Sequence, residues 1–419
     1  MMVIFNAILL FLFDFYIFFA LRASRLVFPK TKWFAIIWWS YSILLLIGVY
    51  VSFKFSIPLA YRSIILVAFF LTAISKFIYV IILLLDDIRR GGIWISRLLT
   101  PPKPKTIETR IDQLDEPLPE VPTKGITRSE FLLKSGIVVA SLPLFPLTWG
   151  IISGAHDYEV RRQRLVLPNL PKAFHGFKIA QISDVHSGSF YNKKAVLGGI
   201  EMLLGEKPDA IFFTGDLVNN LASEMRDYQD LFSKLHAEFG VFSVLGNHDY
   251  GDYHFGQVES AAKAKNFQDM LDVHKVMNWD LLMDENRILK VGQDELAIVG
   301  VQNWGNGRFP KKGDLQKSLL GTEEVSTKLL LSHDPSHWRA QVLDSSVDAM
   351  FAGHTHGMQF GVRGEHYQWS PAKFIYKEWA GLYKEGDKQL YVNTGFGFLG
   401  YPGRVGIVPE ITLFELVTA

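Results

Sequence analysis

Two histidines stand one residue apart in the segment Gly353–Gly357, directly after the mostly apolar run 347–352. Side chains at positions i and i+2 of an extended segment point to the same side, so His354 and His356 can face one small volume beyond a strand end. Glycine allows the backbone to approach that volume closely. Because imidazole is a common metal ligand, the pattern predicts a metal site there.

Four more clusters share this design, in which an apolar run stops at residues suited to binding a cation. They are Asp184 and His186 after 179–183, Gly215 and Asp216 after 210–214, Gly246–Asp249 after 241–245, and His333 after 329–332. In a sheet of parallel strands with helices on its faces, ligands sit beyond the carboxyl ends of the strands. The five clusters are therefore expected to converge. Since the chain has no cysteine, nitrogen and oxygen must hold the metal.

From about Pro168 to its end, the chain resembles the calcineurin-like metallophosphoesterases, and among them a membrane-attached bacterial branch. Five motifs in series carry the resemblance: Asp184-Val185-His186, Gly215-Asp216-Leu217-Val218-Asn219, Gly246-Asn247-His248-Asp249, His333 and Gly353-His354-Thr355-His356. The resemblance implies an α/β fold, a four-layer α/β/β/α sandwich, which here follows an α-helical transmembrane region.

The resemblance also implies a binuclear centre with two divalent metal ions. In the family pattern the first ion is held by Asp184, His186, Asp216 and His356, and the second by Asp216, Asn247, His333 and His354. The Asp216 carboxylate would bridge the two. A mixed set of nitrogen and oxygen ligands accepts Mn, Fe, Zn or Co.

Three further residues are predicted to serve the reaction. By resemblance His248 is the catalytic residue that binds the phosphate and protonates the leaving oxygen, a role suited to a group that titrates near neutrality. Asp249 either orients His248, without binding a metal ion itself, or is an exposed turn carboxylate. Arg404 is predicted to anchor the substrate, because arginine binds phosphate with two parallel hydrogen bonds; a structural ion pair is the alternative.

Alternating strands and helices are expected to position these residues. The sequence predicts strands at 178–182, 210–213, 241–245, 328–331, 347–351, 390–392 and 411–414, helices at 193–204, 223–235 and 257–273, and a hairpin over 289–299 around Gly292. Alternation first and strand pairs later indicate two packed sheets with helices outside.

The first part of the chain has the composition of a membrane region. Apolar segments at 3–21, 33–53 and 64–85 are each close to the ~20 residues that cross a bilayer. A fourth segment, 135–155, contains Pro143 and Pro146, which kink helices but are tolerated in membranes. The predicted domains are three transmembrane helices in 1–99, a Pro-rich linker at 100–125, the fourth membrane segment at 126–156 and the metallophosphoesterase domain at 157–419.

Lysine and arginine gather in 22–32 and 86–134, which predicts that both segments are cytoplasmic. With four crossings, the domain that follows lies outside the cytoplasm, at a bacterial inner membrane. If the fourth segment does not cross, the domain is cytoplasmic. Asp14 and Lys76 are charged residues within the first and third spans, and they either pair or are accommodated separately, Lys76 by reaching the interface.

The expected activity is hydrolysis of phosphate or pyrophosphate esters, with lipid or envelope precursors among the substrates. The expected partners are a phosphorylated, lipid-linked substrate and the bilayer. A net charge of +1 gives no argument for nucleic acid, and none is expected as a partner. Alternatives are a nuclease or cyclic-nucleotide phosphodiesterase, and a non-catalytic membrane phosphate sensor.

Aromatic residues alternate with lysines between His356 and the last strands. They are Trp369, Phe374, Tyr376, Trp379 and Tyr383, interleaved with Lys373, Lys377 and Lys384. Aromatic rings beside lysines suit a lipid headgroup interface. A loop that packs its rings into the core is the alternative.

Overall fold

The computed structural model describes residues 2–55, 59–99, 127–307, 309–364 and 367–419. The chain forms two compact units, Met1–Pro146 and Leu147–Ala419. The second unit thus begins at Leu147, before the predicted domain boundary at 157. The predicted Pro-rich linker at 100–125 lies outside the described residues.

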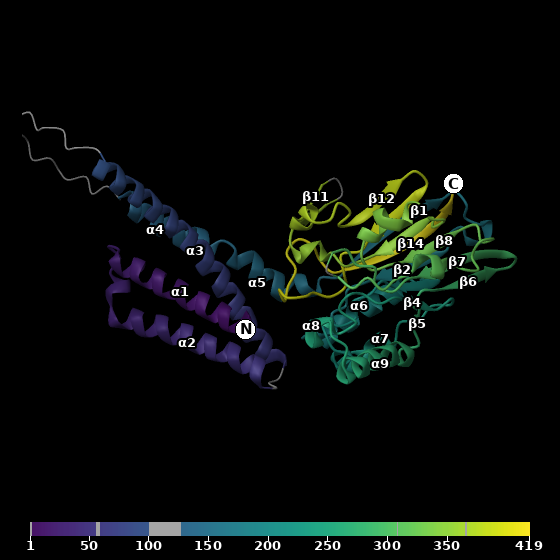
Figure 1. Ribbon diagram of the computed structural model, residues 1–419, viewed down its shortest axis with the longest axis horizontal. Helices are drawn as coiled ribbons and strands as arrows, with labels where there is room; N and C mark the ends of the chain where they lie inside the picture. Colours follow the sequence, from purple (N-terminus) through teal and green to yellow (C-terminus); the bar gives the residue numbers. More distant parts are fainter. Residues whose placement is uncertain (1, 56–58, 100–126, 308, 365–366) are drawn as a thin grey trace, which may run out of the picture. The chain divides into compact units, whose positions relative to one another are not determined.

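The first unit is helical. Its helices are α1 (Met2–Ala23), α2 (Lys32–Lys54), α3 (Leu59–Leu99) and α4 (Arg128–Ser141), followed across the unit boundary by α5 (Leu144–Ile152) (Figure 1). Within the described residues, three helical segments are long and apolar enough to cross a membrane: Lys32–Ser52, Ile64–Leu99 and Arg128–His156. The chain is therefore an integral membrane protein. The predicted first crossing forms α1, and the predicted kink falls between α4 and α5, at Pro143.

Asp14 and Lys76 form a buried ion pair between α1 and α3. The Lys76 Nζ lies 2.5 Å from Asp14 Oδ1 and also donates to Ser42 Oγ on α2, at 3.2 Å. Asp14 is fully buried. A charge inside a membrane segment is costly unless it meets a partner, so the pair joins three helices at one level. The sequence left open whether Asp14 and Lys76 pair or are accommodated separately, and the structure shows that they pair.

The second unit contains two mixed six-stranded sheets (Figure 1). The first has the order β1 (Glu159–Leu167), β14 (Glu410–Thr418), β2 (Lys178–Ile182), β3 (Ala210–Phe213), β4 (Val241–Ser243) and β5 (Asp280–Leu281). The second has the order β12 (Gly381–Glu385), β13 (Lys388–Val392), β9 (Ala349–Ala352), β8 (Lys328–Leu331), β7 (Asp294–Gly300) and β6 (Glu285–Val291). A small hairpin, β10 (Val362–Arg363) and β11 (Gln368–Trp369), stands apart.

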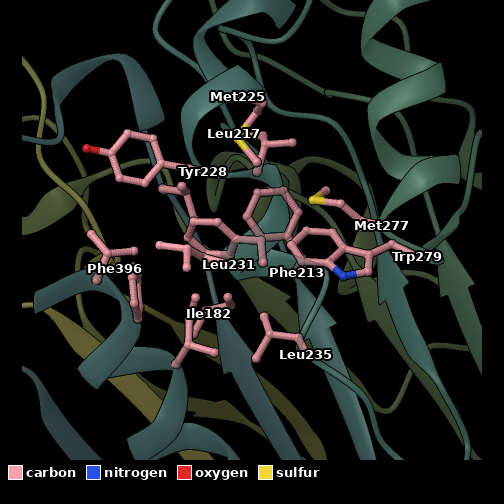
Figure 2. Packing of buried hydrophobic residues seen from close by; sticks show 14 of the residues in the cluster. Ile182, Phe213, Leu217, Met225, Tyr228, Leu231, Leu235, Met277, Trp279 and Phe396 are labelled. Atoms are coloured by element: carbon pink, nitrogen blue, oxygen red, sulfur yellow. The ribbon is translucent and has the colours of Figure 1, made fainter. Parts of the chain in front are cut away.

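The two sheets pack face to face. Phe351 of β9 contacts Phe212 of β3 and Phe414 of β14, with ring centroids 5.1 and 4.9 Å apart. The outer face of the first sheet is covered by α6 (Lys193–Gly205), α7 (Gln229–Phe232) and α9 (Ala261–Val276). Figure 2 shows the packing there, with the Phe213 ring 5.2 Å from Trp279. On the other side, Trp338 and α10 (Leu315–Leu319) cover the second sheet. The predicted α/β/β/α sandwich is confirmed.

Most predicted elements form with their expected type. The Gly292 turn has a φ of 62°, a left-handed conformation that glycine adopts freely, and it joins β6 to β7. The helix predicted at 223–235 is wrong as one helix, because that stretch is a 3₁₀ segment, Ala222–Asp227, followed by the short α7. The strands β1 and β12 were missed, because their exposed residues include several charges.

Candidate metal centre

The seven predicted metal ligands lie just beyond the carboxyl ends of five strands. In the first sheet β2, β3 and β4 run parallel, and in the second sheet β8 and β9 run parallel. The two sheets face each other with these ends at the same edge, since the residues that follow them come into contact. The strand ends therefore converge on one place, as the pattern of apolar runs predicted.

Three of the predicted first-ion ligands form one buried cluster, Asp184, His186 and His356. The Nε2 atoms of His186 and His356 are 3.0 Å apart, and His356 Nε2 lies 3.2 Å from Asp184 Oδ1. Ligand atoms from two separated segments, the loops after β2 and β9, thus point at the same small volume.

A second cluster is formed by Asp216, His333 and His354. The Asp216 Oδ2 lies 3.1 Å from His333 Nε2, and His333 Nε2 lies 3.3 Å from His354 Nδ1. The same Asp216 oxygen is 3.6 Å from His186 Nε2 in the first cluster. One carboxylate therefore stands between the two clusters. This arrangement is consistent with a binuclear metal site.

Asn247 gives an independent test of whether a cation fits. Its Oδ1 is buried and has no hydrogen-bond partner among the described residues, while its Nδ2 donates to Tyr253 Oη at 3.0 Å. A buried polar atom without a partner is costly, and a cation would supply what this oxygen lacks. The donor set of imidazole nitrogens and carboxylate or amide oxygens therefore fits divalent metal ions.

The charge on Asp216 sets the electrostatics of the site. Burial opposes a charge on His333, but the Asp216 carboxylate outweighs it and raises the pKa of His333 to about 10. Burial dominates at His186 and His354 and lowers the pKa of both. Neutral imidazoles offer a lone pair, and a bound metal ion competes with protons for these atoms.

Five of the predicted ligands have left-handed backbone conformations. Asp184, His186, Asp216, His354 and His356 have φ angles of 52°, 47°, 60°, 72° and 51°. Such angles are uncommon outside glycine and cluster at functional sites, where the surroundings hold them in place. Here the Asp184 carboxylate accepts the His354 N–H at 3.0 Å, and Asp216 Oδ1 accepts the His248 N–H at 2.8 Å. The ligands thus hold one another's loops.

Asp249 has a role different from both predicted ones. It is fully buried and accepts four backbone N–H groups, from Asp216, Leu217, Val218 and Gly246, at 2.8 to 3.3 Å. It does not orient His248, whose Nδ1 instead lies 2.6 Å from the Asn219 carbonyl oxygen. Asp249 therefore fixes the backbone that carries Asp216, one step behind the metal cluster.

His248 stands beside the first cluster with a defined orientation. Because a carbonyl oxygen only accepts hydrogen bonds, the contact with Asn219 places a proton on Nδ1. The ring stacks on Tyr253, with centroids 4.3 Å apart, and meets His186 edge-on at 4.9 Å. His248 is only partly buried and lines a cavity of about 370 Å³ together with Asp216, Asn247 and His354. Its Nε2 is the nitrogen left for a ligand.

Arg404 does not fit the predicted role of phosphate anchor. The side chain is buried, and its guanidinium donates to the backbone carbonyl oxygens of Thr394, Gly395, Gly397 and Ile407. Its donors are thus committed to the loop that passes behind His356, with 3.4 Å between Arg404 Nη2 and His356 Nδ1. The prediction is corrected: Arg404 stabilises the wall of the site.

Tyr376 was missed as a site residue. Its Oη lies 2.8 Å from His354 Nε2, so the ring nitrogen that faces away from His333 has a partner. Tyr376 also lines the cavity. In the sequence it was one of several aromatic residues interleaved with lysines, and nothing in that pattern singled it out.

Comparisons with known proteins agree with this geometry. Residues 1–155 match the family described as "Probable Calcineurin-like phosphoesterase, transmembrane domain", and residues 177–358 match "Calcineurin-like phosphoesterase". The second match includes all seven predicted metal ligands. Fold and site together define a calcineurin-like phosphoesterase. The chain belongs to the calcineurin-like metallophosphoesterases with an N-terminal transmembrane domain, and it is a metal-dependent phosphoesterase.

Its relatives are bacterial and eukaryotic. The uncharacterized metallophosphoesterase YkuE of Bacillus subtilis is 29% identical over 265 residues, 62% of this chain and 86% of that protein. An uncharacterized metallophosphoesterase of Campylobacter jejuni is 28% identical over 66% of this chain and 67% of its own length. A "transmembrane protein with metallophosphoesterase domain" of Danio rerio is 25% identical over 65% of this chain and 60% of its own length.

Proposed function

We propose that the protein hydrolyses phosphate or pyrophosphate esters of membrane lipids or envelope precursors, with His248 as the general acid. The observation that carries this proposal is the position of His248. Its Nδ1 is bonded to the Asn219 carbonyl, and its ring lines the same cavity as Asp216 and Asn247. A domain kept only for binding would not need an acid oriented in this way.

The residues assigned to the metal ions follow the two clusters. Asp184, His186, Asp216 and His356 would hold the first ion, and Asp216, Asn247, His333 and His354 would hold the second. When bound, two such ions make water nucleophilic and stabilise the charge on the phosphoryl group. The donor set accepts Mn, Fe, Zn or Co.

The chain's own side chains then position and protonate the ester. With the phosphoryl group in the cavity, the protonated His248 donates its Nε2 proton to the leaving oxygen. The Nδ1–H bond to the Asn219 carbonyl fixes the orientation of the ring during transfer. The wall formed by Tyr376 and Phe309 excludes water from one side of His354.

The cavity lining favours this substrate class over nucleic acid. The described lining residues are Asp216, Asn247, His248, Phe309, His354, Thr355, His356, Met358, Ile375, Tyr376 and Leu399, and none of them is a lysine or arginine. Single-stranded nucleic acid is usually bound along a positively charged groove. The apolar side chains in this lining, among them Phe309, Met358 and Ile375, instead suit an ester with an apolar portion.

Phosphate release from a panel of esters tests the proposal. The full chain in detergent with Mn²⁺ is expected to release phosphate from lipid phosphates faster than from nucleotides or sugar phosphates, and to lose this activity in EDTA. Release from nucleotides alone would support the nuclease or phosphodiesterase alternative. Metal binding without turnover on any ester would support a sensor.

We also propose that the catalytic domain lies outside the cytoplasm. Its support is the lysine and arginine content of 22–32 and 86–134, which predicts that those segments are cytoplasmic, together with the candidate span Arg128–His156, which would carry the chain to the other side. Because the chain has no cysteine, a single Val276→Cys reports the exposed end of α9 without background. A membrane-impermeant maleimide is expected to label it in intact cells. Arg97→Cys, on the predicted cytoplasmic side, serves as the control that should need lysis; labelling of Val276→Cys only after lysis would reverse the orientation.

A further inference from the structure

Exposed apolar side chains gather beside the metal cavity. We call Met358, Phe360, Val362, Phe374 and Ile375 the apolar ridge. Met358 and Ile375 line the cavity itself, and the adjacent Phe374 and Ile375 are 76% and 66% exposed. Single exposed apolar residues are ordinary, but a group next to a functional site marks an interaction surface.

The ridge is held outward by packed structure beneath it. Ala372, Trp379, Ala380 and Ile407 form a small buried cluster under the 3₁₀ segment Pro371–Phe374. Ser370 caps this segment by accepting the Ala372 N–H at 3.0 Å, and its hydroxyl donates to the Gly357 carbonyl at 2.5 Å. Within this segment Ala372 is therefore buried, while Lys373 and Phe374 are exposed. Of the aromatic residues predicted for a headgroup interface, Trp379 packs inside and Phe374 points outward.

Two lysines flank the outermost ridge residues. Lys373 and Lys377 are exposed on either side of Phe374 and Ile375, and the Lys373 Nζ lies 5.4 Å from the Phe374 ring centroid. Within the described part of the chain neither lysine forms a salt bridge, since the nearby Glu378 pairs with Arg339. Apolar groups bordered by unneutralised lysines match a lipid surface, where chains lie below a layer of phosphates.

The ridge is joined through backbone hydrogen bonds to the end of a membrane helix. Within the second unit, the loop 401–405 receives α5: Tyr401 Oη donates to the Leu147 carbonyl at 2.5 Å, and the Arg404 N–H donates to the Gly150 carbonyl at 3.1 Å. The other side of this loop pairs with the ridge segment. The Val405 N–H donates to the Gln359 carbonyl at 2.8 Å, and the Gly361 N–H donates to the Val405 carbonyl at 2.9 Å.

This connection determines what covers the ridge. The α5 residues that contact this loop belong to the candidate membrane span Arg128–His156. On the same helix, Trp149 and Ile152 are exposed. Just after α5, the backbone at Gly154 packs directly against the loop 401–405, because an added Cβ there would meet the Arg404 carbonyl oxygen at 2.1 Å. A surface fixed this closely to a candidate membrane span is expected to meet lipid at high effective concentration.

We propose that the apolar ridge docks into the bilayer surface beside the end of α5, so that the metal cavity opens onto the headgroup layer. The docking itself stands apart from turnover. The consequence for substrate rests on the proposed function: the substrate class is a phosphorylated lipid whose chains remain in the bilayer while its phosphate enters the cavity.

Spin labels on the full chain in lipid nanodiscs test the docking. The cysteine-free sequence allows Phe374→Cys to be labelled alone, with Leu320→Cys and Val276→Cys as controls of similar exposure, 68% and 65%, at the ends of α10 and α9. The label at 374 is expected to be several-fold more accessible to oxygen than to a water-soluble nickel chelate, and the controls to show the reverse. Equal accessibility ratios at 374, 320 and 276 would overturn the proposal.

A second measurement separates docking from catalysis. In Phe374→Asp/Val362→Asp, neither residue lines the cavity, so hydrolysis of a soluble chromogenic phosphate ester is expected to be unchanged. The KM for a lipid phosphate in vesicles is expected to rise roughly tenfold or more, because charge replaces apolar contact with lipid. An unchanged KM for the lipid, together with a spin label at 374 that is as accessible to the nickel chelate as the control labels, would refute docking of the ridge. The proposed function would still stand. Docked labels in a chain that turns over no ester would refute the proposed function and leave the ridge standing.

Discussion

Asp216→Asn is expected to remove most of the bound metal and lower kcat by roughly 10³-fold. The Asp216 Oδ2 is 3.1 Å from His333 and 3.6 Å from His186, so this one oxygen serves both clusters. An amide of the same shape keeps the fold, because it can still accept the His248 N–H that now meets Oδ1. It removes the negative charge that neutralises two cations. Metal catalysis supplies several kcal/mol of charge stabilisation, and 1.36 kcal/mol corresponds to a tenfold change in rate.

Elemental analysis of the purified full chain and kcat on a chromogenic ester measure this effect together. Asp227→Asn is the matched control, because its side chain is 79% exposed on the same domain. Both variants should still melt in one cooperative transition, which separates loss of metal from loss of fold; Asp216→Asn should melt at the lower temperature, because it lacks the stabilisation that bound metal gives the folded state. Two equivalents of metal with unchanged kcat in Asp216→Asn would show that Asp216 does not bridge two cations.

Much of the site could be predicted from sequence because each ligand follows its own buried strand. A buried parallel strand reads as a short, continuous apolar run, and 210–213 and 329–331 are such runs, followed within three residues by Asp216 and His333. Strand ends in one layer collect at one edge. The chemistry at the edge is therefore visible in the one-dimensional pattern.

The parts that failed depend on contacts that pattern does not encode. Arg404 follows a glycine-rich turn, and the type of its neighbours could not show that its guanidinium would be enclosed by carbonyl oxygens. Asp249 adjoins His248 in the chain, but its carboxylate turns to the Asp216 loop, because three backbone N–H groups there need an acceptor. Adjacent residues in a tight turn point in different directions, and only the fold decides which.

In the membrane unit, too, some features could be predicted from the sequence and others could not. Hydropathy predicts the existence of spans, since a bilayer fixes their length. The pairing of Asp14 with Lys76 required that α1 and α3 place these residues at one level, and Ser42 on α2 as the third member was not predicted. Helix lengths follow from composition, but rotation about each helix axis is set by packing.

Replacing His248 by glutamine is expected to slow hydrolysis of an alkyl phosphate ~10²–10⁴-fold, the usual contribution of a general acid. His248 is not one of the ligand atoms in either cluster, so bound metal should remain. The decisive comparison is between leaving groups. An alkoxide leaves poorly unless it is protonated, whereas nitrophenolate leaves readily without a proton. The loss of kcat should therefore be much smaller for a nitrophenyl ester than for the alkyl phosphate.

This dependence distinguishes an acid from a residue that only binds phosphate. Loss of a phosphate contact would raise KM or slow both esters alike, because the phosphoryl group is the same in each. Exposed His236 on the same domain supplies the control, and His236→Gln should match the parent on both esters. An equal loss for both esters in His248→Gln would assign His248 to phosphate binding and leave the proton to another donor. Tyr253 is the first to examine, since its ring stacks on His248 with centroids 4.3 Å apart and its Oη accepts a hydrogen bond from Asn247 Nδ2.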